Sequence, residues 1–70
     1  MMPLVFGDRG EEYIIKKIGG TPEVKKHLED LGCVVGGTVQ IVNTMGKNLI
    51  VSVKEVRVAL SKELAQKIMI

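Results

Sequence analysis

The change of hydrophobic period between Thr21 and Val42 constrains the fold more than any other feature of the chain. Three apolar residues first recur at i, i+4 and i+7, which places them on one face of a helix: Val24, Leu28 and Leu31. After Gly32 and the pair Gly36-Gly37, the period becomes two at Thr38, as in a strand. The stretch therefore predicts one short helix, a glycine corner and the first of several strands.

Both ends of the predicted helix carry local signals. Thr21 is a good N-cap, and Pro22 suits the first helical position because its missing N–H would have no partner there. Gly32 can adopt the left-handed conformation that ends a helix, so we expect the helix over residues 22–31. Glycines before a helix N-terminus could also bind an anion, but a turn followed by an N-cap accounts for the same residues.

The rest of the chain alternates in the manner of short strands separated by turns. A hairpin turn is expected at Met45-Gly46-Lys47, and Ser61 is expected to cap a helical turn, with Leu64 and Ala65 facing inward. Ile14 and Ile15 are adjacent, so one of them should lie at a bulge or a rim. The expected strands are Glu11–Ile18, the segment around Val39–Ile41, Leu49–Lys54, Val56–Leu60 and Ile68–Ile70, and the helical turn is Lys62–Gln66.

These elements predict a mostly β protein built as a small five-stranded barrel. One short α-helix is inserted after the first strand, and a short helical turn precedes the last. Closing the sheet would remove exposed edges, which is important for a chain rich in valine and isoleucine.

Length and composition place the chain among small globular proteins. Its 70 residues predict a single domain over residues 1–70, which would bury about 60% of its unfolded surface. The single cysteine, Cys33, suits a reducing compartment, and no apolar run approaches the roughly 20 residues that cross a bilayer. The N-terminus also lacks the features of a secretion signal. We therefore expect a soluble, cytoplasmic protein without direct membrane insertion.

Charge and aromatic content argue against nucleic acid as a partner. The net charge is +2, and the basic and acidic residues are interspersed without a long basic block. Proteins that bind single strands stack bases on aromatic side chains in a basic groove. Phe6 and Tyr13 are the only aromatic residues, and they lie away from most of the lysines in the sequence.

The sequence predicts no catalytic centre, and it contains one candidate metal site. With a single histidine and a single cysteine, no nucleophile–base pair can be assembled. Glu23, His27 and Asp30 recur at i, i+4 and i+7, so they share one flank of the predicted helix. They could hold a divalent transition metal with waters or a neighbouring chain's ligands. The alternative is a solvated flank of charged residues. Cys33 could join His27, or it could be a small core thiol.

The chain resembles the ferrous-iron transport accessory protein A (FeoA) family over nearly its whole length, and three stretches carry the resemblance. Cys33 stands where the family often has methionine, and Lys47-Asn48 stands where many members have proline after the turn. The resemblance is carried by His27–Val39, Met45–Val51 and Arg57–Ile68.

The resemblance implies an SH3-like barrel, similar also to the C-terminal domain of iron-dependent repressors. It further implies a cytosolic, non-enzymatic role in Fe(II) uptake, beside a membrane permease that has a cytoplasmic GTP-binding domain. No cofactor is required for this role. The alternative is a metal-responsive regulator or metallochaperone of the same fold, which would bind Fe(II), Mn(II) or Zn(II).

We expect the permease's cytoplasmic region to dock on the helix corner. Val34 and Val35 would form an apolar anchor beside two glycines, unless both valines pack beneath the helix. Homo-oligomers, formed by strand pairing or bridged by metal, stay open at this point. The predicted partner-binding residues are Leu31, Gly32, Cys33, Val34 and Val35.

Overall fold

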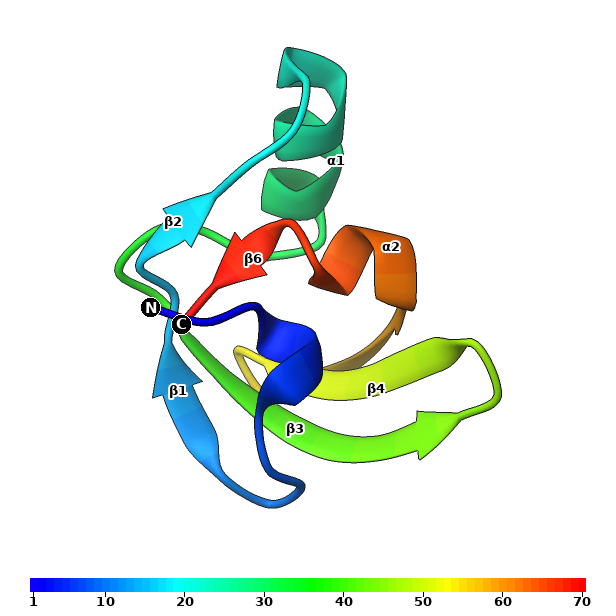
Figure 1. Ribbon diagram of the computed structural model, residues 1–70. Helices are drawn as coiled ribbons and strands as arrows, with labels where there is room; N and C mark the ends of the chain where they lie inside the picture. The colour runs from blue at the N-terminus through cyan, green and yellow to red at the C-terminus, as the bar shows by residue number, and fades with distance from the viewer.

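A computed structural model describes residues 1–70 as two antiparallel sheets with two α-helices and a short 3-10 helix (Figure 1). One sheet has the strand order β1-β3-β4-β5, and the other pairs β2 with β6. In chain order the elements are η1 (Leu4–Phe6), β1 (Glu12–Ile14), β2 (Lys17–Ile18), α1 (Pro22–Asp30), β3 (Thr38–Met45), β4 (Asn48–Val53), β5 (Val56–Ser61), α2 (Lys62–Ala65) and β6 (Ile68–Met69). The prediction of a mostly β fold with one main helix is confirmed.

The predicted first strand is two strands that belong to different sheets. Ile14 is 60% exposed and ends β1, whereas Ile15 is 1% exposed and faces the core. The chain bends between Ile15 and Lys16, so that the Lys16 N–H donates to the Met69 C=O at 2.8 Å. The adjacent isoleucines thus mark a change of sheet. The prediction of five strands in one closed barrel was wrong, because this bend gives six strands in two sheets.

The β3–β4–β5 meander confirms the alternation that the sequence predicts. Gly46 has a φ of +58° in the predicted β3–β4 turn, where positive φ favours glycine. Of the apolar residues on one face of β5, only Leu60 is fully buried, and Val56 beside the β4–β5 turn is 61% exposed. The meander's buried residues are Val39, Ile41, Leu49, Val51, Val53 and Leu60.

The two termini meet and close one side of the molecule. The Met2 N–H donates to the Ile70 C=O at 3.0 Å, and the Ile70 N–H donates back at 2.8 Å. Leu4, in a 3-10 helix that the sequence did not predict, is fully buried. The predicted cap of α2 is confirmed, because the Leu64 N–H donates to Ser61 Oγ at 3.2 Å.

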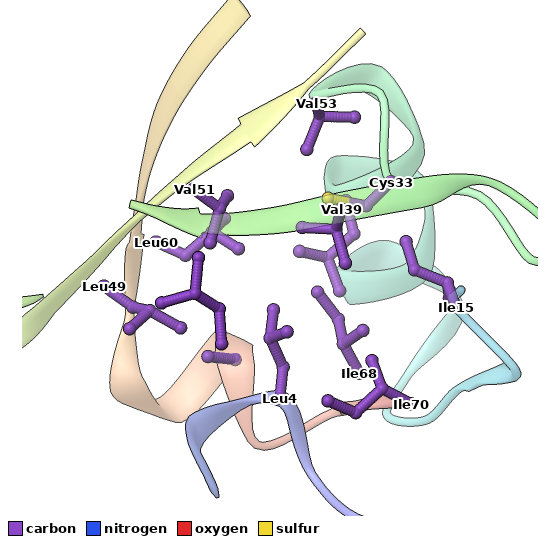
Figure 2. Close-up of a cluster of buried hydrophobic side chains, with 13 residues drawn as sticks. Leu4, Ile15, Cys33, Val39, Leu49, Val51, Val53, Leu60, Ile68 and Ile70 are labelled. Atoms are coloured by element: carbon purple, nitrogen blue, oxygen red, sulfur yellow. The ribbon is translucent and has the colours of Figure 1, made fainter. Parts of the chain in front are cut away.

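One core joins both sheets and both helices. It contains thirteen buried residues and no buried polar side chain, and Figure 2 shows the side chains converging from several elements. Of the nine residues of α1, only Leu28 is buried. None of the helices has the length and apolar character that a membrane crossing requires. In Figure 1, α1 lies above β2 and β6, and its C-terminal end leads into residues 31–37, which form the corner.

Candidate partner-binding corner

The N-terminal end of α1 has the predicted cap. The Val24 N–H donates to Thr21 Oγ1 at 3.3 Å, and Pro22 occupies the first helical position. This bond satisfies one of the donors that a helix start leaves unpaired. Val24 and Leu31 are half-buried against the core on either side of the buried Leu28, so the predicted apolar face is confirmed.

The C-terminal end of α1 is a Schellman motif. The Gly32 N–H donates to the Glu29 C=O at 2.9 Å, and the Cys33 N–H donates to the Leu28 C=O at 2.9 Å. Gly32 has a φ of +101°, where an L side chain would be strained, and a Cβ there would lie 3.2 Å from Val53 Cγ1. The helix ends at Asp30, one residue earlier than expected, with Leu31 as its C-cap.

The same motif places Cys33 in the core. Cys33 and Leu28 are both fully buried in the same core cluster, as is usual for the two apolar positions of this kind of helix end. Burial raises the pKa of the Cys33 thiol above its ordinary value, because the charged thiolate would lose its hydration. A neutral thiol is neither a good nucleophile nor a ready metal ligand. The expectation of a small core thiol is confirmed.

A tight turn after Cys33 presents Val35 to solvent. The Gly37 N–H donates to the Val34 C=O at 2.9 Å, and Gly36 has a φ of +88°, as the third residue of a type II turn requires. The turn is tied to the core because the Gly36 N–H donates to the Ile15 C=O at 2.8 Å and the Ile15 N–H donates to the Gly37 C=O at 2.9 Å. Val35, at the tip, is 62% exposed.

A groove of about 410 Å³ lies beside this turn, between α1, β2 and the corner. Sequence reasoning missed three of its residues, which come from β2 and from α1. Lys25 and Glu29 are spaced i, i+4, so their position on the flank of the apolar stripe was readable. Ile18 had no such signal, because it depends on the bend of the chain after Ile15. The lining residues are Ile18, Lys25, Glu29, Cys33, Val34 and Val35.

The five predicted corner residues differ in what a partner could touch. Val35 is exposed, Val34 and Leu31 are half-buried, and Cys33 is fully buried beneath them. Gly32 is half-buried and turns the chain. The surface available for contact is therefore made mainly by the two valines, with the other three residues holding them in place.

The predicted metal residues lie on the other flank of α1. With about 100° per residue, Glu23, His27 and Asp30 fall on one side of the apolar stripe, and the groove residues Lys25 and Glu29 fall on the opposite side. Glu23, His27 and Asp30 are all exposed. Nowhere does the protein gather three His, Cys, Asp or Glu side chains in an arrangement that could hold a metal ion. Any metal bound there would need ligands from outside the chain.

The two aromatic residues have different surroundings. Tyr13 is half-buried, and its hydroxyl oxygen accepts a hydrogen bond from the Asp8 N–H at 2.8 Å. Phe6 is exposed on η1. They do not form a pair of neighbouring stacking surfaces at the corner groove, whose lining contains no aromatic residue.

Comparison with known proteins identifies relatives over the whole chain. A family model described as the FeoA domain matches residues 2–70. The protein named "Putative Fe(2+) transport protein A" of Methanocaldococcus jannaschii is 33% identical over 70 residues, which are 100% of this chain and 85% of that protein. The crystal structure of an iron uptake regulatory protein (FeoA) has a TM-score of 0.90 and 34% identity, covering 97% of this chain and 90% of that chain.

Two less similar structures share the fold. FeoA of Stenotrophomonas maltophilia, an SH3 domain protein complexed with zinc, has a TM-score of 0.84 at 23% identity, covering 99% of this chain and 88% of that chain. A manganese-dependent transcriptional repressor has a TM-score of 0.85 at 16% identity, covering 94% of this chain and 38% of that chain. The expected likeness to the C-terminal domain of iron-dependent repressors is confirmed for the SH3-like fold, which a manganese-dependent repressor shares.

Proposed function

The chain belongs to the FeoA family, and we propose that it is a non-enzymatic cytoplasmic accessory protein for Fe(II) uptake. In this proposal residues 1–70 act as one domain that docks on the cytoplasmic region of the ferrous-iron permease. Fe(II) is the cargo of the permease, and the accessory protein needs no cofactor of its own. Membership of the FeoA family supports a role as an accessory protein in Fe(II) transport.

One observation carries the proposed docking site. Val35 places an apolar side chain in solvent, 62% exposed, on a turn that two backbone hydrogen bonds fasten to Ile15. An exposed apolar residue on a rigid turn loses little conformational entropy when a partner covers it. The groove beside it adds apolar surface from Ile18 and Val34. A few residues usually carry most of the binding energy of an interface, and we propose Val35 for that part at the corner.

The test compares two exposed apolar residues in different regions. Val35→Asp alters the corner, and Met45→Asp is its matched control, because Met45 is 64% exposed at the β3–β4 hairpin. Both variants are expected to fold, since substitutions at exposed sites usually change stability by less than about 0.5 kcal/mol. Titration calorimetry against the permease's cytoplasmic domain should give at least about tenfold weaker binding for Val35→Asp. Unchanged binding of Val35→Asp would remove the corner from the proposal.

The alternative function is a metal-binding regulator or metallochaperone, and one observation favours it. Glu23, His27 and Asp30 are all exposed along one flank of α1, where a second molecule could complete a coordination shell. Equilibrium dialysis of the protein and of His27→Ala against anaerobic Fe(II), Mn(II) and Zn(II) separates the two functions. Stoichiometric metal that His27→Ala loses would favour the alternative, and loss of permease binding by Val35→Asp favours the accessory role.

A further inference from the structure

We propose that the corner groove receives an extended peptide segment of the partner, whose carbonyl oxygens accept hydrogen bonds from the Val34 and Val35 N–H groups. The proposal rests on the proposed function, because it keeps the corner as the docking site and adds the chemistry of the element that docks there.

The first support is a pair of unpaired donors. The Val34 and Val35 N–H groups donate to no backbone or side-chain acceptor in the protein. The N–H groups on both sides of this pair are bonded: those of Leu31, Gly32, Cys33, Gly36 and Gly37. A partner that covers Val35 removes water from the two free donors, and a buried N–H without an acceptor is unfavourable. The docking element must therefore supply acceptors close to an apolar side chain, as a peptide backbone does.

The second support is the course of the chain around the groove. Ile15 exchanges hydrogen bonds with Gly36 and Gly37, so the corner runs beside the β1–β2 segment at this point. At Lys16 the chain leaves the corner and bonds to Met69 of β6. The groove lies where the two segments separate, between Ile18 and Val34. An extended segment placed there would lie between the two segments that part at Ile15, beside the N–H groups of Val34 and Val35.

The third support is the lining of the groove. Four of its six lining residues are apolar, and about 410 Å³ suits aliphatic side chains from a docked segment. The two charged residues, Lys25 and Glu29, have opposite signs. A free anion would gain from Lys25 but be repelled by Glu29, whereas neutral main-chain groups can bond to either. The mixed pair therefore favours a peptide segment over a carboxylate or phosphate ligand.

The test uses the intact chain labelled with ¹⁵N and overlapping twelve-residue peptides that tile the permease's cytoplasmic region. The permease's whole cytoplasmic domain is titrated in parallel. At least one peptide should bind, and amide hydrogen exchange at Val34 and Val35 should slow by about tenfold or more when it is saturating. The amide of Lys47, which also lacks an acceptor but lies at the β3–β4 turn, is the internal control and should not slow. Val35→Asp should weaken binding of the peptide by about tenfold, and Met45→Asp should leave the affinity unchanged.

The possible results separate this inference from the proposed function. If the domain binds at the corner but no peptide binds, and Val34 and Val35 exchange as fast as in the free protein, the peptide mode is overturned while docking stands. Binding of a peptide that leaves both amides unprotected would also overturn it. If neither the domain nor any peptide shifts any amide of the protein, the proposed function itself fails. A second copy of the chain on the corner, seen as a dimer by light scattering that Val35→Asp dissociates, would contradict the proposal.

Discussion

The β3–β4–β5 meander and the α1 corner use similar residues in opposite ways. The meander provides six of the thirteen buried residues, whereas α1 and the corner provide two, Leu28 and Cys33. Its strands are paired residue by residue along both hairpins, apart from one irregularity between Ile41 and Asn43. The corner holds two valines in a turn and leaves their N–H groups free.

This difference indicates that the meander carries much of the stability, whereas the docking that we propose lies in a different part of the small molecule. In the meander, alternation sends Val39 and Val51 into the core, where burial of each valine contributes about 1.5–3 kcal/mol. At the corner, the Schellman motif buries Cys33 and the following turn exposes Val35. Val35 therefore contributes little to the free energy of unfolding. Substitutions in the two regions should therefore have separable effects on stability and on binding.

The largest expected effect is on the meander core. Leu60→Ala removes a fully buried side chain from β5 and should lower the free energy of unfolding by about 2–5 kcal/mol. A chain of 70 residues has roughly 4–10 kcal/mol in total, so a large part of its stability would be lost. Urea unfolding followed by circular dichroism measures this loss. Met45→Ala, on the exposed end of β3, is the control, and an equal loss there would break the comparison.

A smaller effect is expected where the two regions touch. Gly32→Ala places a Cβ at a φ of +101° and 3.2 Å from Val53 Cγ1, and it should cost about 2 kcal/mol. Gly46→Ala is the matched control, because its φ of +58° lies in the left-handed region and no atom lies within 4 Å of the added Cβ. Gly46→Ala should cost about 1 kcal/mol. Equal costs in thermal unfolding would show that the Val53 contact does not constrain the corner.

The β4–β5 turn offers a stabilising change within the meander. Lys54 and Glu55 have φ values of +52° and +68°, which are unfavourable for side chains of these types. Replacing them together with Asn and Gly, the residues that such hairpin turns prefer, should raise the free energy of unfolding by about 1 kcal/mol. Binding of the permease's cytoplasmic domain should stay unchanged. If the variant is no more stable than the wild type, the positive φ values of Lys54 and Glu55 do not strain this turn.

The smallest expected effect concerns the pH dependence of stability at Cys33. Burial raises the pKa of this thiol in the folded state, so the unfolded chain loses its proton first as the pH rises. The contribution is fully present below the unfolded pKa of about 8.5 and declines as the pH rises toward the higher folded value. At pH 9 the loss should be on the order of 1 kcal/mol or less. Cys33→Ala should lack this part of the decline in urea titrations, and identical slopes for the two proteins would disprove it.

Local signals predicted those parts of the fold that depend on neighbouring residues. Thr21 and Gly32 fixed both ends of α1 within one residue, and Ser61 fixed the start of α2, because caps act within a single turn. The alternation of Leu49 and Val51 located β4 because a strand with one buried face repeats every two residues. These interactions can be recognised without knowledge of the tertiary structure.

The features that sequence reasoning missed depend on contacts between distant segments. The exposed Ile14 and buried Ile15 differ because the chain changes sheets, and only the pairing with β6 decides where that happens. The groove follows from the same bend, since it brings Ile18 opposite Val34. Leu4 is buried because the two termini meet. No local sequence pattern predicts the 3-10 helix that contains it.

The most direct measurement of the central claim is an amide chemical-shift titration of the ¹⁵N-labelled protein with the permease's cytoplasmic domain. We predict shifts clustered on residues 31–37 and on Ile18 at the groove, with the amides of the β3–β4 turn unchanged. Shifts centred on Met45 and Lys47, or no shifts at all with a folded domain, would contradict docking at the corner.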